Sequence, residues 1–211
     1  MPVKIDFKKK WKNLYNPPTK KVSIVELPEI QYLMVEGQGD PNTSQEFKDT
    51  YAIIFPVAYT LKFMSKTKGK DYVVMPPEAL WWADNMNEFL EGNKDNWKWF
   101  SIMMIPDYIT QEMFEEAIIT VKEKKADKLP TTFSKLRFEK YNEGKAAQIM
   151  HIGPYSEEHD NIMLIHSAIE DMGGHFDGKK WGQYHHEIYL SDPRRAKPER
   201  MKTVIRQPFI L

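Results

Sequence analysis

The same order of sequence patterns occurs twice along this chain of 211 residues. Alternating apolar segments at residues 23–26 and 30–36 precede a Gly-Pro break, an amphipathic helix pattern and two further strand patterns. A second series begins at residues 136–141 and ends at residues 202–210. Internal repeats constrain a fold strongly, because each repeat forms the same unit. The pattern predicts an α+β fold with two pseudo-symmetric strand-strand-helix-strand-strand repeats. We expect their sheets to join, with helices on one side and a crevice on the other.

The repeats set the expected organisation of the chain. We interpret residues 1–211 as a single domain, in which the basic residues 1–20 form an N-terminal arm outside the core. The first repeat is assigned to residues 21–109 and the second to residues 133–211. Between them, an apolar stripe at helical spacing predicts a linker helix within residues 110–132.

Local signals place the helix ends. Thr43 and Glu46 have the spacing of a capping box, which predicts a helix start. Ser156 is a suitable N-cap for the helix of the second repeat, and the negative charges of Glu157 and Glu158 suit the positive end of that helix. A short polar helix is expected at residues 84–91.

Composition and spacing exclude several classes of function. The chain has 30 Lys and Arg and 30 Asp and Glu, so we expect no attraction to nucleic acid or to an anionic membrane. It has no cysteine, which rules out disulfides, thiolate metal sites and a cysteine nucleophile. The six histidines lack metal-ligand spacing and no nucleotide-binding loop is present, so neither a metal nor a cofactor is expected. Because no signal sequence or membrane span is found, we expect a cytoplasmic protein.

Aromatic residues make up 13% of the chain, and four tryptophans lie close together in sequence: Trp81, Trp82, Trp97 and Trp99. Taken singly, each is most simply a core residue. Their clustering also suits an aromatic-lined cavity, because ligand pockets favour such walls.

Glu187 is the main candidate for chemistry. In a strand at residues 185–190, alternation places His185, Glu187 and Tyr189 on one face. The nearby Trp181 and Tyr184 indicate that this face is lined with aromatic rings. Among such rings a carboxylate has a raised pKa and could act as a general base or bind a cation. The alternative is an ordinary solvated charge on a wet sheet surface.

Glu78 occupies the matching position of the first repeat, because Glu78-Ala79-Leu80-Trp81 aligns with the segment that begins at Glu187. Quasi-symmetry would bring the two carboxylates to opposite walls of one crevice, where they could divide the roles of acid and base. The alternative is a surface carboxylate that follows a Pro-Pro turn.

Five segments together carry a resemblance to a known family: Asp6-Phe7-Lys8-Lys9, the run from Tyr32 to Pro41, Ala58-Tyr59-Thr60-Leu61-Lys62, Glu78-x-Leu80-Trp81-Trp82, and the tail from His186 to Arg195. They resemble the stand-alone members of the gyrase-inhibitor-like (GyrI-like) small-molecule-binding family. The resemblance implies two tandem SH2-like strand-helix-strand-strand units with a ligand cleft at their interface.

The resemblance also implies functional residues. The module is similar to the ligand-sensing domains of multidrug-responsive transcription activators, in which a buried Glu among aromatic residues receives cationic, planar drugs. Certain stand-alone members are similar to hydrolases that open electrophilic, cyclopropane-bearing toxins with water. By motif position, Glu187, Glu78 and Trp81 match the residues implicated there. We add as ligand-binding candidates Trp82, Tyr155, Trp181, Tyr184 and Tyr189.

Three functions remain open. The first is a binding module that sequesters or senses amphipathic or cationic xenobiotics in an aromatic cleft. The second is a detoxifying hydrolase, in which Glu187 activates water while Glu78 or a tyrosine protonates the leaving group. The third is a role with an unidentified protein partner, such as modulation of a topoisomerase. Sensor relatives usually carry a helix-turn-helix domain, for which this sequence offers no segment, so direct DNA binding is not expected.

Overall fold

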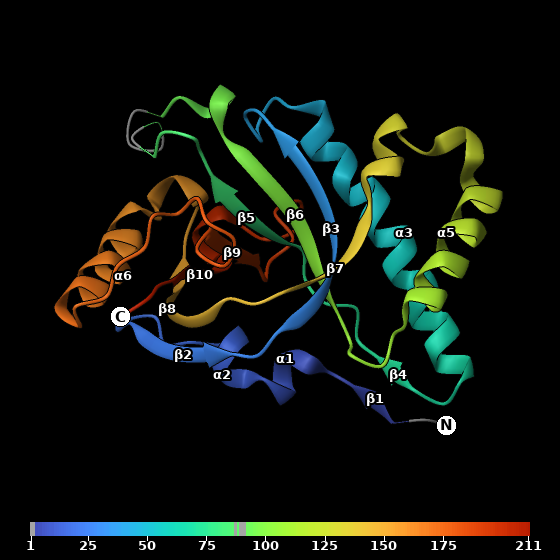
Figure 1. The fold of residues 1–211 in the computed structure, drawn as a ribbon, viewed down its shortest axis with the longest axis horizontal. Coiled ribbons are helices and arrows are strands. Elements are labelled where there is room, and N and C mark those ends of the chain that lie inside the picture. Colours follow the sequence, from blue (N-terminus) through green and yellow to red (C-terminus); the bar gives the residue numbers. More distant parts are fainter. Residues whose placement is uncertain (1–2, 87, 89–91) are drawn as a thin grey trace.

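The computed structural model describes residues 3–86, 88 and 92–211. Within these residues, an eight-stranded antiparallel sheet runs in the order β2-β8-β10-β9-β5-β6-β3-β7 (Figure 1). Its strands are β2 (Ser23–Leu27), β3 (Ile30–Gln38), β5 (Glu78–Trp82), β6 (Lys98–Ile105), β7 (Arg137–Tyr141), β8 (Gly144–Ile152), β9 (His185–Tyr189) and β10 (Lys202–Pro208). The predicted α+β class is confirmed.

The helices are α1 (Phe7–Lys10), α2 (Lys12–Tyr15), α3 (Gln45–Thr67), α5 (Gln111–Lys125) and α6 (His159–Asp171). A separate parallel pair joins β1 (Lys4–Ile5) to β4 (Asp71–Tyr72). The helix expected at residues 84–91 falls in part outside the described residues. No helix that the structure describes is both long and apolar enough to cross a membrane.

The two halves of the sheet exchange their outer strands. β2, from the first half of the chain, pairs with β8, and β7, from the second half, pairs with β3. At the centre, β5 of the first half pairs with β9 of the second. Each half of the sheet therefore contains an outer strand that comes from the other half of the chain.

Both long helices next to the sheet, α3 and α6, pack on one face. On α3, the Thr50 hydroxyl lies 3.0 Å from the Ser101 hydroxyl of β6. On α6, Ile165 and Ile169 pack in a buried cluster with Ile205 of β10. Ladder partners in an antiparallel sheet project to the same side. The register Ser101–Ala79, Ala79–Glu187 and Glu187–Ile205 therefore puts both helices on the face that also carries the Glu187 side chain.

The opposite face is filled, because the N-terminal arm lies across it. Leu14 and Tyr15 are 3% and 4% exposed. The expectation that the arm lies outside the core is therefore wrong. The arm was interpreted from its many lysines, which point outward. The few apolar residues among them, which face the sheet, give only a weak signal in the sequence. The crevice expected on the face opposite α3 and α6 is likewise wrong, because the arm, with its short helices α1 and α2, occupies that face.

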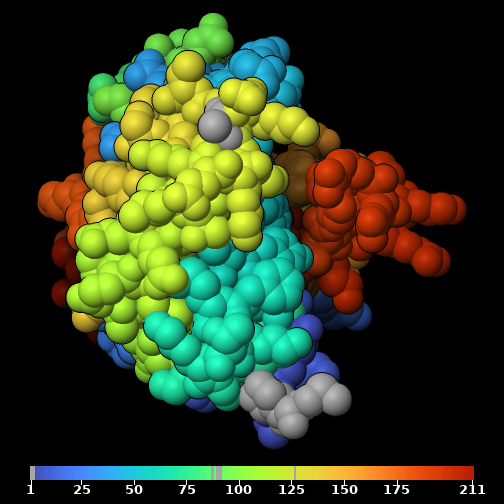
Figure 2. All heavy atoms as spheres, turned by 90° about the vertical axis from the view of Figure 1, so that its right-hand side faces the viewer, coloured from blue at the N-terminus to red at the C-terminus, as the bar shows by residue number. Residues whose placement is uncertain are grey.

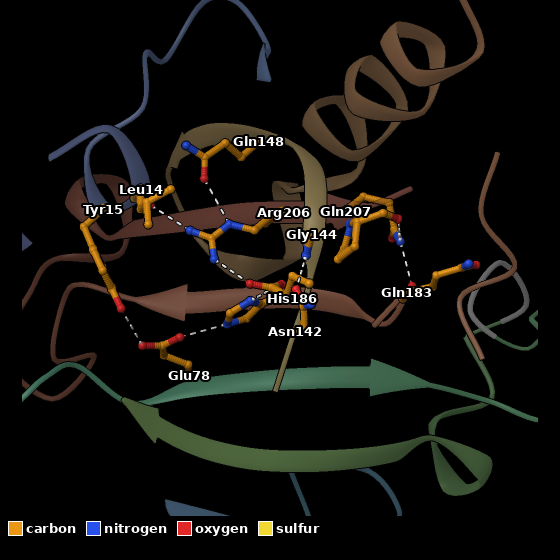
Figure 3. Close-up of polar contacts among 12 residues, drawn as sticks. Leu14, Tyr15, Glu78, Asn142, Gly144, Gln148, Gln183, His186, Arg206 and Gln207 are labelled. Carbon is orange, nitrogen blue, oxygen red and sulfur yellow. Dashed lines mark hydrogen bonds and ion pairs between the residues drawn. The ribbon is translucent and has the colours of Figure 1, made fainter. Parts of the chain in front are cut away.

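Beneath the arm lies a buried polar network, which we define as Tyr15, Glu78, Glu143, Gln148, His186 and Arg206 (Figure 3). Glu78 accepts a hydrogen bond from the Tyr15 hydroxyl at 3.3 Å, and its other oxygen lies 2.9 Å from Nε2 of His186. The remaining ring nitrogen of His186 lies 2.8 Å from Glu143, which also accepts from Arg206 at 2.9 Å. Arg206 in turn donates to the backbone carbonyl of Leu14. This network therefore fixes the arm to the centre of the sheet.

The helix starts differ slightly from the predicted ones. The N-cap of α3 is Ser44, whose hydroxyl accepts from the amide of Phe47 at 3.2 Å, one residue after the predicted Thr43. The second helix begins only at His159, because Ser156 lies in a preceding 3-10 turn (Tyr155–Glu157).

Candidate functional site

Glu187 lies at the centre of the sheet, on β9. β10 and β5 flank this strand, and its side chains alternate between the two faces of the sheet. His186 and Ile188 are fully buried on the arm side. His185, Glu187 and Tyr189 project to the helix side, as the alternation predicted.

Each carboxylate oxygen of Glu187 has a partner. The Tyr189 hydroxyl donates to one oxygen at 2.7 Å, and Nε2 of His185 lies 3.3 Å from the other. The indole N–H of Trp81 donates to the Tyr189 hydroxyl at 3.3 Å. Burial favours the neutral acid, but hydrogen bonding with His185 and Tyr189 outweighs it and lowers the pKa of Glu187. The sequence-based expectation of a raised pKa is therefore wrong, and the side chain is ionised at neutral pH.

Aromatic rings surround this carboxylate. Phe47 of α3 packs against Trp81 at 5.5 Å and against Trp99 at 5.1 Å between ring centroids. Tyr155 meets Tyr189 edge to face at 5.5 Å. We give the name Glu187 cleft to the group formed by Glu187 and these packed rings. It is walled by α3 on one side and by the segment that precedes α6 on the other.

The Glu187 cleft reaches the surface beside Tyr155. That side chain is 41% exposed, whereas the Glu187 side chain is only 17% exposed. Burial and then the negative charge of Glu187 raise the pKa of Tyr155 to about 12, with smaller contributions that include Asp192. Figure 2 shows a hollow between α3 (cyan) and the segment around residues 190–200 (red). A ligand could therefore enter between these two walls.

A second carboxyl group lies beside Glu187. Glu158, directly before α6, is 4% exposed. Burial and then repulsion from Glu187 raise its pKa to about 9. Of the two carboxyl groups, Glu158 is therefore the weaker acid and Glu187 the stronger.

The structure divides the predicted site residues between two faces of the sheet. Glu187, Trp81, Tyr155 and Tyr189 are brought together in the Glu187 cleft. Glu78 is not, because it pairs with Ile188 and so projects to the arm side. The predicted meeting of Glu78 and Glu187 in one crevice is wrong. Glu78 is also no surface carboxylate, since it is fully buried in the polar network.

Trp82, Tyr184 and Trp181 form a separate aromatic cluster on the arm side. Trp82 lies 4.7 Å from Tyr184, which lies 6.1 Å from Trp181, between ring centroids. Trp82 also lines a surface hollow of about 570 Å³ with Glu36, Lys98 and other residues. This hollow does not include Glu187, and its cations are already ion-paired, Lys98 with Asp84 and Arg137 with Glu36. We therefore place the candidate site at the Glu187 cleft.

Sequence reasoning missed Glu158, His185 and Phe47 as members of the site. Glu158 was interpreted only as a favourable charge at a helix start, and Phe47 only as part of the apolar stripe of α3. Strand alternation placed His185 on the same face as Glu187, and this pattern could have identified His185 as a member of the site. No comparable signal marks Glu158, because its place depends on how α6 packs on the sheet.

Comparison with known proteins identifies the family and the fold of the chain. The model of the GyrI-like small molecule binding domain matches residues 20–209. An uncharacterised conserved protein from Listeria innocua is 39% identical, with a TM-score of 0.88 over 98% of this chain and 100% of the other. A structure titled as a hydrolase from Listeria innocua is 38% identical, with a TM-score of 0.85 over 99% and 100% of the two chains. None of the curated proteins matches.

A more distant structure, the EcmrR C-terminal domain, is 14% identical, with a TM-score of 0.54 over 90% of this chain and 97% of the other. At this identity the likeness concerns the fold alone. The family model covers nearly the whole chain, and the resemblance stated from the sequence motifs is confirmed. The chain belongs to the family of GyrI-like small molecule binding domains.

Proposed function

We propose that this protein binds an amphipathic, aromatic small molecule in the Glu187 cleft, with a cationic or hydrogen-bond-donating group of the ligand against Glu187. The observation that carries the proposal is the ionised, largely buried carboxylate of Glu187, held by His185 and Tyr189 within aromatic walls. A carboxylate that already has fixed partners needs little reorganisation when a ligand arrives.

The walls explain why the ligand should be aromatic. Aromatic rings stabilise a bound planar ligand in two ways. Apolar area is buried, and the rings make offset or edge-to-face contacts with the ligand. A cation close to Trp81 or Tyr189 gains further attraction from the ring faces, and this attraction is strongest where water is displaced. The same cation meets the opposite charge of Glu187 at short range.

Binding of the planar cation rhodamine 6G, measured by fluorescence polarisation, tests the proposal. Glu187→Gln keeps the shape of the side chain but removes its charge, so we expect affinity to fall by about tenfold or more. The matched control is Glu139→Gln, because Glu139 is a partly exposed β7 residue that is ion-paired with Arg137 and lies away from the cleft. Equal affinity of wild type and Glu187→Gln would show that Glu187 is not the ligand's partner.

A hydrolase is the second candidate, and a specific observation favours it. A 38% identical protein that spans this whole chain is titled a hydrolase. The ionised Glu187 could accept a proton from an attacking water, and the exposed Tyr155 beside it marks the side on which water can reach it. Glu78 takes no part, because it lies on the other face of the sheet.

Mass spectrometry separates binding from hydrolysis. Strained electrophiles, including cyclopropane-bearing ones, would be incubated with wild type and with Glu187→Gln. If wild type adds one water to the electrophile and Glu187→Gln does not, the protein is an enzyme with a Glu187-dependent step. If wild type retains a ligand without converting it, the hydrolase proposal fails for that compound and only the binding function remains.

A further inference from the structure

A row of aromatic rings on α3 faces the solvent, away from the Glu187 cleft. Phe55, Tyr59 and Phe63 follow one another at every fourth residue, with 6.4 Å between the ring centroids at each step. Tyr59 is 46% exposed and Phe63 is 57% exposed. The outward face of a surface helix is normally polar, whereas adjacent exposed rings are typical of a contact surface.

These rings form one wall of a groove between α3 and α5 that has a volume of about 360 Å³. The other wall is formed by Val121, Lys124 and Lys125 of α5. We call this the α3–α5 groove. Neither lysine has an ion-pair partner among the described residues, and no carboxylate lines the groove in that part of the chain. The groove is therefore both apolar and positively charged.

The outward face of α6 has the opposite charge. Its apolar residues Met163 and Leu164 are 48% and 51% exposed. Asp160, Glu170 and Asp171 are exposed towards the two ends of the same helix, and α6 contains no lysine or arginine. None of these three carboxylates is ion-paired within the described residues. We call these five residues the α6 surface, which is apolar at its middle and negatively charged at its ends.

The acidic end of α6 is not explained by the helix itself. Free carbonyl groups give the C-terminal end of a helix a partial negative charge, so cations are favoured there and carboxylates are not. The last turn of α5 follows this rule with three lysines. In contrast, α6 ends in Glu170 and Asp171 and has no basic residue in its last turn. Cations from another molecule would remove this repulsion.

The two surfaces lie at opposite ends of the molecule. In Figure 1, where the longest axis is horizontal, α3 and α5 lie side by side at one end of the sheet and α6 lies at the other. The surfaces therefore cannot meet within one chain. Contact between two grooves would bring lysines together, and contact between two α6 surfaces would bring carboxylates together. The complementary combination is the groove of one copy with the α6 surface of another.

A membrane is a poorer match for the α3–α5 groove. The groove is a hollow between two helices, whereas a bilayer presents a flat surface. The formal net charge of the chain is zero, so the whole molecule has no long-range attraction to anionic lipid.

We propose that the α6 surface of one copy of this chain docks in the α3–α5 groove of a second copy. Met163 and Leu164 pack against Tyr59 and Phe63, while the carboxylates of α6 meet the two lysines of the groove. Each copy offers both surfaces, so association continues head to tail into a closed ring or an open chain. The proposal is independent of the ligand-binding function proposed above.

Sedimentation velocity tests the association directly. The mass of wild type should exceed the chain mass of 24.9 kDa and should rise with protein concentration. It should fall back towards 24.9 kDa as salt is added, because part of the attraction joins exposed charges.

Charge reversal tests the groove. Lys124→Glu combined with Lys125→Glu places four carboxylate or carbonyl-rich ends against one another, so this variant should remain monomeric. The matched control is Lys9→Glu combined with Lys12→Glu, the same change of charge at exposed positions of the N-terminal arm, on the other face of the sheet. This control should associate as wild type does. Circular dichroism checks that each variant is folded.

A mixture of two variants tests the head-to-tail geometry. Tyr59→Ser with Phe63→Ser removes the rings of the groove but leaves α6 intact, and Met163→Ser with Leu164→Ser does the reverse. Each variant alone should be monomeric. Together they should form a 1:1 complex of about twice the chain mass of 24.9 kDa that grows no further, because only one intact pair of surfaces is present.

Three results would overturn the proposal. They are a monomeric wild type, a Lys124→Glu and Lys125→Glu variant that associates as wild type does, and a mixture that forms no 1:1 complex. If wild type is monomeric but sediments with phosphatidylserine vesicles, and the groove variants do not, the groove belongs to a membrane contact instead.

Discussion

Removal of the charge of Glu143 should destabilise the protein more than removal of any surface carboxylate. Its side chain is 2% exposed and is bonded to both His186 and Arg206. Burial opposes ionisation, but the charges of His186 and Arg206 outweigh it and lower the pKa of Glu143 from 4.5 to about 2. Because folding and ionisation are linked, this difference corresponds to about 3 kcal/mol of stability at neutral pH.

Glu143→Gln should therefore lower the free energy of unfolding by about 3 to 5 kcal/mol, since it also leaves the buried Arg206 and His186 without their negatively charged partner. For a chain of this size, this corresponds to a fall in Tm of roughly 10 °C. Urea unfolding followed by tryptophan fluorescence measures the loss as a lower midpoint with an unchanged slope. The matched control is Glu139→Gln, which removes a partly exposed carboxylate paired at 3.3 Å with Arg137 and should change stability by about 0.5 kcal/mol or less.

The dependence on pH gives a second check on the same residue. A carboxylate with a lowered pKa contributes stability that is fully present above its unfolded pKa, close to 4.5, and is lost as pH falls to about 2. Wild type should lose more stability than Glu143→Gln across this range. A loss of less than about 1 kcal/mol in the variant at neutral pH, or equal acid sensitivity of both proteins, would refute this account of the polar network.

Three further perturbations have expected outcomes. Gly37→Ala would place a methyl group 2.1 Å from the buried ring of Trp99, so we expect a loss of about 1 to 3 kcal/mol in urea unfolding. Tyr15→Phe removes the donor to Glu78 and should cost about 1 to 2 kcal/mol and make the N-terminal arm more accessible to limited proteolysis, and unchanged cleavage would argue against its role as an anchor. Trp81→Phe keeps an aromatic ring but removes an indole donor and buried volume, so rhodamine 6G should bind several-fold more weakly and urea unfolding should show a loss of about 1 to 3 kcal/mol.

Much of the fold could be predicted from the sequence, because strand alternation and helical stripes are local signals. The predicted strand at residues 202–210 corresponds to β10 at Lys202–Pro208, and the predicted linker helix contains α5 at Gln111–Lys125. The face of the sheet on which a residue lies could not be predicted in this way, because it depends on the register of strand pairing. Glu78 and Glu187 matched as motifs but pair with Ile188 and Ala79, one step out of phase, and so project to opposite sides.

The candidate site was predictable only where the residues adjoin in one strand. Glu187 and Tyr189 share a face of β9 by alternation, and that part needed no tertiary information. Glu158 approaches Glu187 only because α6 packs on the sheet, and a carboxylate before a helix has an ordinary explanation in the helix dipole. The N-terminal arm was misjudged for a similar reason, since its many lysines conceal Leu14 and Tyr15.

The exchange of outer strands has a consequence for synthesis on the ribosome. β2 is among the first strands to emerge, yet its partner β8 is translated more than a hundred residues later, as the pairing of Ser23 with Gln148 makes plain. Until then, one edge of the nascent protein has nothing to pair with, and pairings this distant in sequence form slowly. An interrupted or truncated translation product would therefore expose unpaired edges that invite aggregation. We expect that neither half of this protein folds by itself. The two halves should fold only as one chain or as two fragments that associate.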